Sequence, residues 1–366
     1  MRNSDNSNQN DSGLTDTTEH VPPHHRAGHR RLFLGLIIAV AIATTVGLSV
    51  LDTIRAAKRS PERGEKVEST PVANTGETPE PGSSWRLEGL GLNMIWIEPG
   101  SFLMGSPENE SGRKDNESTH RFTIPQGYWL SEFEIRHRDW QQFVDDTGYI
   151  TMAEQRQRDF GTWVYDPTEN KIVQHPSANW KTIQALGPDH PVQGISWHDV
   201  IAFCEWLTRV ESEKGNLAPG QKYTLPSEVQ WEFACRERGN ATGPFYFGDS
   251  LETHQANFNG FHAYGTKRKG VYLSHSEPVG SYPPNALGLY DMHGNTFEWT
   301  LSEYSESLAD AVIQPTGEED AAERCYKGGS WFDLGIYCRA AFRGHTDPTD
   351  RSDHMGARLA LIYQTP

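Results

Sequence analysis

Apolar residues recur at helical spacing in several segments of the chain. Between positions 135 and 144, Ile135, Trp140, Phe143 and Val144 fall on one face of a helix. Gly148 follows shortly afterwards as a stop signal. This pattern predicts a helix that buries its aromatic face and ends near Gly148.

Two further helices are predicted by capping signals as well as by apolar spacing. Ser196 is a suitable N-cap, with Asp199 at the capping-box position, and the apolar face continues toward residue 215. Ser227 and Gln230 repeat this arrangement, and Gly239 is the expected stop. Both helices are therefore expected to begin at a serine.

Elsewhere the apolar runs are short. Residues 94–97 and 102–104 predict strands, and Pro99-Gly100 between them suits a type II turn, so we expect a hairpin. Residues 151–190 show no period and predict irregular structure. With 34 Gly and 22 Pro among 366 residues, the fold should consist of packed loops and short strands with a few helices. The predicted fold class is α+β with little regular secondary structure.

The N-terminal quarter has a different composition. Residues 1–31 form a polar tail, residues 32–51 an uncharged apolar run, and residues 52–84 a linker rich in Pro, Glu and Thr. All eleven tryptophans lie at or after Trp85, so a single folded domain is predicted over residues 85–366.

The apolar run is long enough to cross a hydrocarbon core of ~30 Å as a helix. A signal peptide cleaved after Ala43 is the competing interpretation, but the long polar lead favours an uncleaved anchor. A literal count of flanking basic residues places the large domain in the cytoplasm. Because Arg30 and Arg31 abut the run directly, we expect a single-pass membrane protein with its domain outside the cytoplasm.

The net charge of −16 and the pI near 5.4 argue against a nucleic-acid partner, which would require clustered Lys and Arg. The four cysteines are too few and too scattered for a disulfide scaffold, and none forms a CxxC pair. Cys204 and Cys235 fall on apolar helix faces and are interpreted as buried small hydrophobes.

Candidate chemistry is concentrated near the C-terminus. Gly328 and Gly329 permit a backbone that other residues resist. The polar and aromatic residues that follow are predicted to form a pocket wall: Ser330, Trp331, Asp333, Tyr337 and Cys338. Upstream, Asp291 and Glu298 lie in a turn that also contains glycine and asparagine, which suits a hard cation bound through oxygen.

Six segments, in order, resemble the sulfatase-modifying-factor family, whose type member is the formylglycine-generating enzyme. They read MIWIEPGSFLMGS, HPVQGISWHDVIAFCEWL, YTLPSEVQWEFACR, PVGSYPPNALGLYDMHGNTFEW, KGGSWF and RSDHMGARLAL. The resemblance covers roughly residues 90–362. It implies a C-type-lectin-like α+β fold. It also implies an oxidase that uses copper and dioxygen to convert a cysteine of an exported sulfatase into formylglycine, with two cysteines holding Cu(I).

The chain departs from this pattern at the metal-binding pair. By resemblance, Cys338, preceded by Tyr337, matches the second family cysteine, whereas Asp333 stands in place of the first. Ser330 matches a pocket serine, and Phe297 replaces an active-site tryptophan. Because Cu(I) selects thiolates and a carboxylate suits hard cations, an efficient copper site is not expected. Cys338 is either a reactive thiol or an inert packed one.

The resemblance also bears on disulfides and calcium. Cys204 and Cys235 each match half of a family disulfide, but Arg343 and Leu359 occupy the partner positions, and Cys325 matches no family cysteine. The first implied calcium site uses side chains of Asp291 and Glu298 with carbonyls of Gly294 and Thr296. The second uses Asn257 and the carbonyl of Phe258, with Val271 where a carboxylate is expected.

Three functional hypotheses remain open. The first is a formylglycine-generating-enzyme-like protein acting on an exported polypeptide such as a sulfatase. The second is a different reaction on a peptide, in which Asp333 serves as a general base or metal ligand. The third is a non-catalytic binding or scaffold module. They differ in whether Ser330, Asp333 and Cys338 converge on one open cleft.

Overall fold

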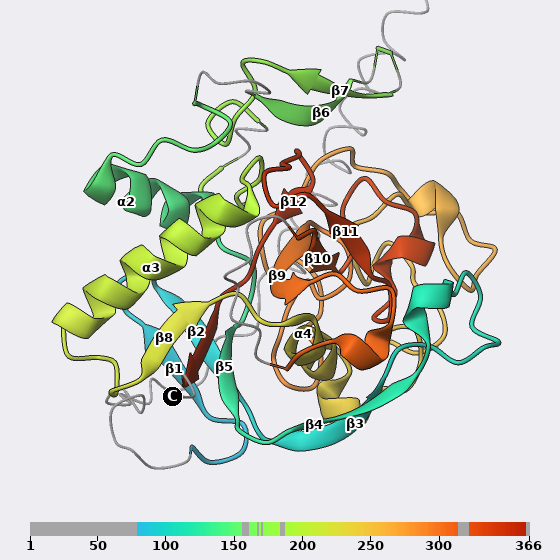
Figure 1. Cartoon of the computed structure of the whole chain (residues 1–366). Coiled ribbons are helices and arrows are strands. Elements are labelled where there is room, and N and C mark those ends of the chain that lie inside the picture. The colour runs from blue at the N-terminus through green and yellow to red at the C-terminus, as the bar shows by residue number, and fades with distance from the viewer. Residues whose placement is uncertain are drawn as a thin grey trace, which may run out of the picture. The chain divides into compact units, whose positions relative to one another are not determined.

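The computed structural model describes residues 79–155, 161–166, 168–169, 171–183, 187–313 and 322–363. These residues form a mixed fold with few helices (Figure 1). The predicted membrane run, residues 32–51, lies outside this part of the chain, as do the polar tail and most of the linker. Within the described residues, no helix is long and apolar enough to cross a bilayer.

A five-stranded antiparallel sheet carries the main hydrophobic core. Its strand order is β1 (Ser84–Leu87), β2 (Leu92–Ile97), β5 (Tyr128–Ser131), β13 (Ala360–Tyr363) and β8 (Gln221–Thr224). Helices α2 (His137–Thr147) and α3 (Trp197–Glu213) lie beside this sheet in Figure 1. Their aromatic faces meet where Trp140 stacks on Phe203, with ring centroids 5.5 Å apart. The sheet thus joins residues near both ends of the domain.

A second, four-stranded sheet positions the candidate site. Its order is β11 (Gly344–Thr346), β10 (Arg324–Lys327), β9 (Phe297–Glu303) and β12 (Met355–Gly356), with β12 parallel to β9. Helix α4 (Glu228–Cys235) packs near it, and the Trp231 indole nitrogen donates to Glu298 on β9 at 2.6 Å. β10 leads directly into the Gly328–Gly329 turn.

The predicted starts of α3 and α4 and the predicted end of α2 are confirmed, whereas α4 ends at Cys235, four residues before the expected stop at Gly239, with Arg236 as its C-cap. Ser196 caps α3 and Ser227 caps α4, each with a complete capping box to Asp199 and Gln230. α2 ends at Gly148, whose positive φ of 67° closes the helix in the left-handed conformation. Cys204 and Cys235 are buried, as their positions on apolar faces predicted.

The predicted hairpin at Pro99-Gly100 is wrong, although both strands exist. β2 pairs with β1 and β5, whereas β3 (Gly100–Met104) pairs with β4 (His120–Ile124) in a separate two-stranded sheet. Gly100 is the first residue of β3 and lacks the positive φ that a type II turn requires. Its lack of a side chain serves packing instead, because a Cβ there would lie 2.9 Å from the Phe233 ring of α4.

Residues 151–190, expected to be irregular, contain a further hairpin. β6 (Thr162–Asp166) pairs with β7 (Lys171–His175) in antiparallel register. Backbone hydrogen bonds hold it to the C-terminal segment, since Trp163 N–H donates to the Arg351 carbonyl and Asp353 N–H to the Trp163 carbonyl. Each strand has only five residues, so the alternation of apolar and polar side chains along it was too short to distinguish a strand from a loop.

Candidate functional site

The Gly328–Gly329 turn has the backbone that its glycines predicted. Their φ angles are 94° and 76°, in the left-handed region that disfavours other residues. A Cβ on Gly329 would lie only 2.4 Å from the Cys338 sulfur. The turn must therefore contain glycine at this position for Cys338 to pack directly beneath it.

Ser330 and Asp333 interact with each other just after this turn. Ser330 is fully buried, and its hydroxyl donates to the Asp333 carboxylate. The Ser330 hydroxyl also accepts from Phe332 N–H at 3.2 Å, and its carbonyl accepts from Asp333 N–H at 3.1 Å. Burial raises the pKa of Asp333, while the nearby His354 and the Ser330 bond act in the opposite direction. The pair closes a tight local turn.

Cys338 is fully buried among apolar side chains, including Phe245 and Phe258. Burial raises the pKa of its thiol well above the usual value, and the Asp333 carboxylate adds to this. Its sulfur lies 3.8 Å from the Leu334 carbonyl oxygen, to which the thiol donates. This environment favours a neutral thiol.

His293 holds the Cys338 backbone in place. Burial lowers the pKa of His293 to about 3, so the imidazole is neutral. Its Nε2 accepts from Tyr246 N–H at 3.2 Å, which leaves the proton on Nδ1 to be donated to the Cys338 carbonyl at 2.7 Å. The contact joins the 291–298 turn to the segment after the Gly328–Gly329 turn.

Tyr337 belongs to a different group of side chains from Ser330 and Asp333. Its ring packs edge-on against Phe342 at 5.3 Å, and Lys114 Nζ lies 5.7 Å from its centroid. Phe297, at the position of the family tryptophan, is buried against Tyr326 with ring centroids 4.6 Å apart. Of the four predicted catalytic residues, the structure thus brings Ser330, Asp333 and Cys338 into one neighbourhood.

The sequence reasoning missed a histidine–aspartate pair beside this neighbourhood. His354 Nδ1 lies 2.9 Å from Asp353 Oδ1, and its ring stacks on Phe332 with centroids 5.4 Å apart. The other carboxylate oxygen of Asp353 accepts from Tyr165 N–H at 2.9 Å. The backbone carbonyl of Asp353 accepts from the Trp331 indole N–H at 3.0 Å. The signal was the adjacent Asp and His in RSDHMGARLAL, which served only to mark the family.

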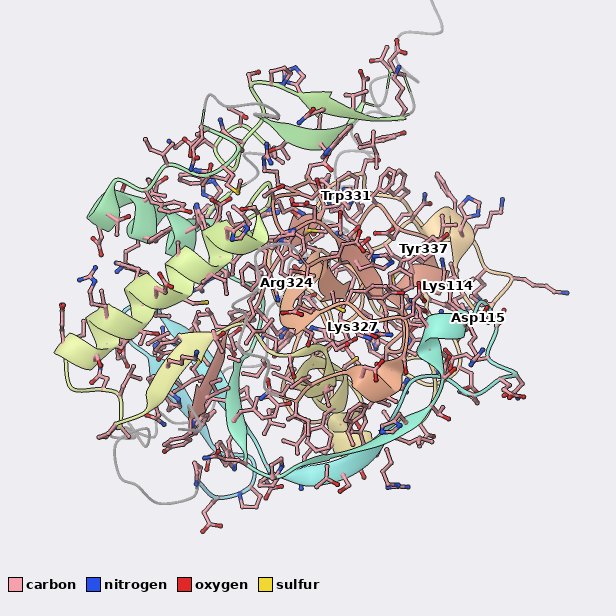
Figure 2. All side chains as sticks on the ribbon, viewed as in Figure 1. Lys114, Asp115, Arg324, Lys327, Trp331 and Tyr337 are labelled. Carbon is pink, nitrogen blue, oxygen red and sulfur yellow. The ribbon has the colours of Figure 1, made fainter. Side chains whose placement is uncertain are left out.

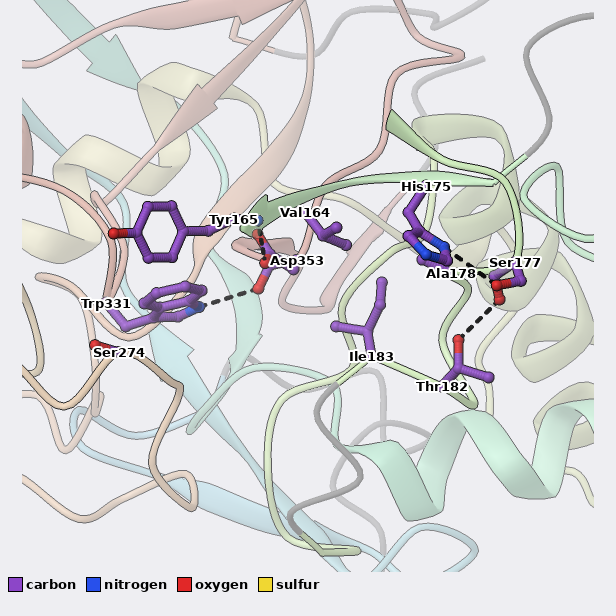
Figure 3. A pocket seen from close by; sticks show the side chains of 10 residues that line it. All are labelled: Val164, Tyr165, His175, Ser177, Ala178, Thr182, Ile183, Ser274, Trp331 and Asp353. Carbon is purple, nitrogen blue, oxygen red and sulfur yellow. Dashed lines mark hydrogen bonds between the residues drawn. The ribbon is translucent and has the colours of Figure 1, made fainter. Parts of the chain in front are cut away.

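A cavity of about 420 Å³ lies next to this pair (Figure 3). Val164 and Tyr165 of β6 line one part of it, Trp331 and Asp353 another, and Ile183 lies across from them. This cavity is not lined by Ser330, Asp333 or Cys338. The turn therefore contributes Trp331 to an open pocket, whereas the buried Ser330 and the partly exposed Asp333 do not line it.

The first implied calcium site lies in a buried, acidic environment. Both Glu298 oxygens accept from the Arg358 guanidinium at 2.7 Å, and Asp291 accepts from Gly280 N–H at 2.6 Å. Burial, with a contribution from Glu298, raises the pKa of Asp291 to about 6. Glu134 is also fully buried here, and its Oε2 has no hydrogen-bond partner among the described residues.

These three carboxyl groups face one guanidinium, and a bound cation would favour the ionised forms of Asp291 and Glu134, whose pKa values burial raises. Across the described part of the chain, however, no three His, Cys, Asp or Glu side chains converge on a single metal position. A calcium ion would therefore need the carbonyls of Gly294 and Thr296 in addition to Asp291 and Glu298.

The second implied calcium site takes part in loop-to-loop hydrogen bonds. The Asn257 amide donates to the His275 carbonyl at 2.9 Å and to the Asn295 side chain at 3.2 Å. Phe258 is buried, whereas Val271 is 58% exposed and offers no side-chain oxygen. Asn257 thus ties the 291–298 turn to its neighbour.

The copper site implied by the resemblance does not fit the donors present. All four cysteines are free and buried, so Arg343 and Leu359 indeed leave Cys204 and Cys235 without disulfide partners. Cys325, which matches no cysteine of the family, is buried near the Arg343–Glu228 pair. Burial raises the pKa of its thiol well above the usual value. Cys338 has a carboxylate rather than a second thiol as its neighbour.

Comparison with known proteins agrees with the fold. The family model described as "Sulfatase-modifying factor enzyme 1-like domain" matches residues 87–362. The chain has 30% identity over 302 residues to a formylglycine-generating enzyme of Thermomonospora curvata, covering 74% of this chain and 94% of that protein. It has 29% identity over 305 residues to the inactive C-alpha-formylglycine-generating enzyme 2 of Bos taurus, covering 74% and 89%.

The structure of PvdO from Pseudomonas aeruginosa is similar in fold, with a TM-score of 0.61, at 24% identity. The similarity covers 78% of this chain and 99% of PvdO. Because proteins named as active and as inactive both appear among the relatives, similarity alone leaves catalytic activity open. The match over residues 87–362 shows that the chain belongs to the sulfatase-modifying-factor family.

Proposed function

We propose that this protein binds a segment of an exported polypeptide, such as a sulfatase, without efficiently oxidising its cysteine through copper. The observation that supports this most directly is the state of Cys338. Its thiol is fully buried and has a raised pKa, and Asp333 stands where the family has the partner cysteine. The protein keeps the family fold but lacks the pair of thiolates.

The donor chemistry explains why copper binding should be weak. Cu(I) is soft and prefers thiolate sulfur, whereas Asp333 offers a hard oxygen that already accepts from Ser330. A neutral thiol is also a poor ligand, because the thiolate is the metal-binding form. A single buried thiol cannot prearrange a metal for an incoming substrate cysteine.

The cavity beside the turn is suited to a peptide segment. Its volume of about 420 Å³ lies in the range of small-ligand pockets, and it combines aromatic and polar lining. The hairpin that lines part of it also carries exposed apolar side chains: Trp163 is 40% exposed on β6, and Ile172 is 39% exposed on β7. Tyr272, which stacks on Trp331 with centroids 6.3 Å apart, adds a further aromatic surface.

The His354–Asp353 pair favours one alternative, a different reaction on the bound peptide. An imidazole oriented through Nδ1 by a carboxylate is the arrangement of a general base. Asp353 lines the cavity, and His354 lies close enough to Asp333 to act to lower the pKa of that carboxyl group. His354→Asn would abolish such a reaction while leaving peptide binding intact.

The test uses the purified full-length protein and a peptide with the sulfatase cysteine motif, with copper and oxygen supplied. We expect peptide binding without rapid conversion of the cysteine, and weaker binding by Tyr165→Ala. Asp333→Cys should increase Cu(I) affinity, whereas Asp333→Ser, which removes the carboxylate without adding a thiol, should not. Rapid conversion of the peptide cysteine by the unmodified protein would contradict the proposal.

A further inference from the structure

Residues 260–271 form a loop that is closed at its base. Gly260 N–H donates to the Val271 carbonyl at 3.1 Å, and Gly270 N–H donates to the Gly260 carbonyl at 2.8 Å. Both glycines lie against the Thr253 side chain, since a Cβ on Gly260 would lie 2.2 Å from it and a Cβ on Gly270 would lie 2.3 Å from it. The two ends of the loop are therefore held together, and the residues between them project from a fixed base.

This loop carries three consecutive cations, and we call residues 260–271 the basic loop. Lys267, Arg268 and Lys269 are all exposed. Arg268 lies 3.4 Å from Glu252 with 80% of its side chain exposed, and an ion pair of this kind is weak. Within the described part of the chain, neither lysine forms an ion pair. Because the whole chain has a net charge of −16, the basic loop is a local reversal of the charge of the molecule.

A row of aromatic rings connects the base of the basic loop to the cavity beside Trp331. Phe261 is 53% exposed, and its ring meets the edge of Tyr272 with centroids 6.1 Å apart. Tyr272 in turn stacks on Trp331 at 6.3 Å, with the ring planes 19° from parallel. Trp331 lines the cavity, and Figure 2 shows it below the β6–β7 hairpin that lines the cavity as well. The row therefore leads from the cavity to an exposed apolar surface.

The length of the chain limits how far the cations lie from this cavity. Ser274 lines the cavity beside Trp331 (Figure 3). Lys269 precedes Ser274 by five positions, so their Cα atoms are at most ~18 Å apart. About six residues of an extended polypeptide span the same distance. One bound segment can therefore place a side chain in the cavity and still reach the cations.

We propose that the basic loop binds acidic residues of the same polypeptide segment that places an apolar side chain in the cavity. This inference rests on the proposed function and narrows its substrate class to segments with an apolar residue and a run of Asp or Glu within about six residues of it. Charge complementarity supports this choice, because the acidic remainder of the surface repels such a run while the three cations attract it. The aromatic row ends in a cavity rather than on an open face, which favours a polypeptide over a lipid surface.

The experiment titrates the full-length protein calorimetrically with three peptides. Acetyl-Phe-Gly-Ser-Glu-Glu-Glu-amide and acetyl-Glu-Glu-Glu-Ser-Gly-Phe-amide present the acidic run in the two possible directions, and acetyl-Phe-Gly-Ser-Gln-Gln-Gln-amide is the neutral match. We expect one acidic peptide to bind about five- to tenfold more tightly than the neutral peptide, since each exposed ion pair contributes about twofold. This advantage should shrink between about 50 and about 300 mM salt, because salt screens exposed charges.

Two triple variants locate the binding of the acidic run. Changing Lys267, Arg268 and Lys269 together to Gln should remove the advantage of the acidic peptide and leave the neutral peptide unchanged. The matched control changes three exposed arginines on β1, β4 and α3 to Gln, namely Arg86, Arg121 and Arg209. The control lowers the net charge by the same amount and should keep most of the advantage.

The outcomes separate this inference from the proposed function. Equal affinity for the acidic and neutral peptides, both weakened by Tyr165→Ala, would overturn the inference and leave the proposed function intact. Absence of binding by all three peptides would overturn both. An equal loss in the control variant would reduce the effect to net charge. Binding of phosphatidylglycerol vesicles but not of the acidic peptides, lost in the loop variant, would assign the basic loop to a lipid surface instead.

Discussion

At the scale of single residues, the burial of Cys338 decides how the candidate site can react. The thiol lies under Gly329 in an apolar cluster, and the backbone carbonyl of Cys338 accepts a hydrogen bond from His293. Sequence alone left open whether this cysteine is reactive or inert. The environment favours an inert thiol, because each unit of pKa increase lowers the thiolate fraction about tenfold at neutral pH.

We therefore expect the native protein to react slowly with an aromatic disulfide reagent and all four cysteines to react after unfolding in urea. The measurement is a thiol titration with and without denaturant. One fast thiol in the native protein that disappears in Cys338→Ala, but persists in Cys204→Ala, would contradict this expectation.

The carboxylates around Arg358 predict a pH dependence of stability. Burial raises the pKa of Glu134 well above its usual value, and that of Asp291 to about 6. The folded state thus holds these protons more tightly than the unfolded chain does. The contribution to stability of both groups is complete below a pH of about 4. That of Asp291 is lost as the pH rises through about 6, and that of Glu134 as the pH rises through its own raised pKa.

Glu134→Gln should therefore raise the melting temperature at pH 7.5 in EDTA and flatten its decline between pH 5 and pH 7.5. Glutamine keeps an oxygen for the Asn295 amide, which donates to Glu134 at 3.1 Å. A gain of about 1 kcal/mol would correspond to roughly 2–4 °C. Thermal unfolding across pH measures this, and a lower melting temperature with an unchanged slope would show that Glu134 is not a source of strain.

At the scale of elements, the capping box of α4 is a clear contributor to stability. The Ser227 hydroxyl accepts from Gln230 N–H at 3.2 Å, and the Gln230 side chain accepts from Ser227 N–H at 2.9 Å. Ser227→Ala should cost about 1 kcal/mol, measured by urea unfolding. Ser212→Ala, at an exposed position late in α3, is the control and should have little effect.

The 291–298 turn is the element in which calcium binding is predicted. If calcium binds Asp291, Gly294, Thr296 and Glu298, its addition should raise the melting temperature by mass action, and EDTA should reverse the gain. Asp291→Asn is the suitable variant, because Glu298 also neutralises the buried Arg358. No response of the unmodified protein to calcium or EDTA would leave the turn without a metal role.

At the scale of the whole molecule, the prediction concerns topology. Residues 32–51 are expected to anchor the chain, with the large domain outside the cytoplasm. A phosphatase reporter fused after Pro366 should then be active, since such reporters require export. Activity of a cytoplasmic fluorescent reporter at the same position, with an inactive phosphatase fusion, would reverse the predicted orientation.

The sequence by itself determined the family, the three helices and the glycine turn. These features depend on local rules: Ser196 and Ser227 cap helices through neighbours three residues away, and positive φ at Gly328 follows from steric limits within one residue. The replacement of the first family cysteine by Asp333 could also be recognised from the sequence alone.

Only the tertiary structure decided which segments meet. β2 and β3 follow one another in the chain but join different sheets, because pairing partners are chosen by long-range packing rather than by the turn between them. The same reason explains why His354 and the β6–β7 hairpin were missed as parts of the site. Burial of Cys338 likewise depends on Phe245 and Phe258, 93 and 80 positions earlier in the chain, which no local pattern could reveal.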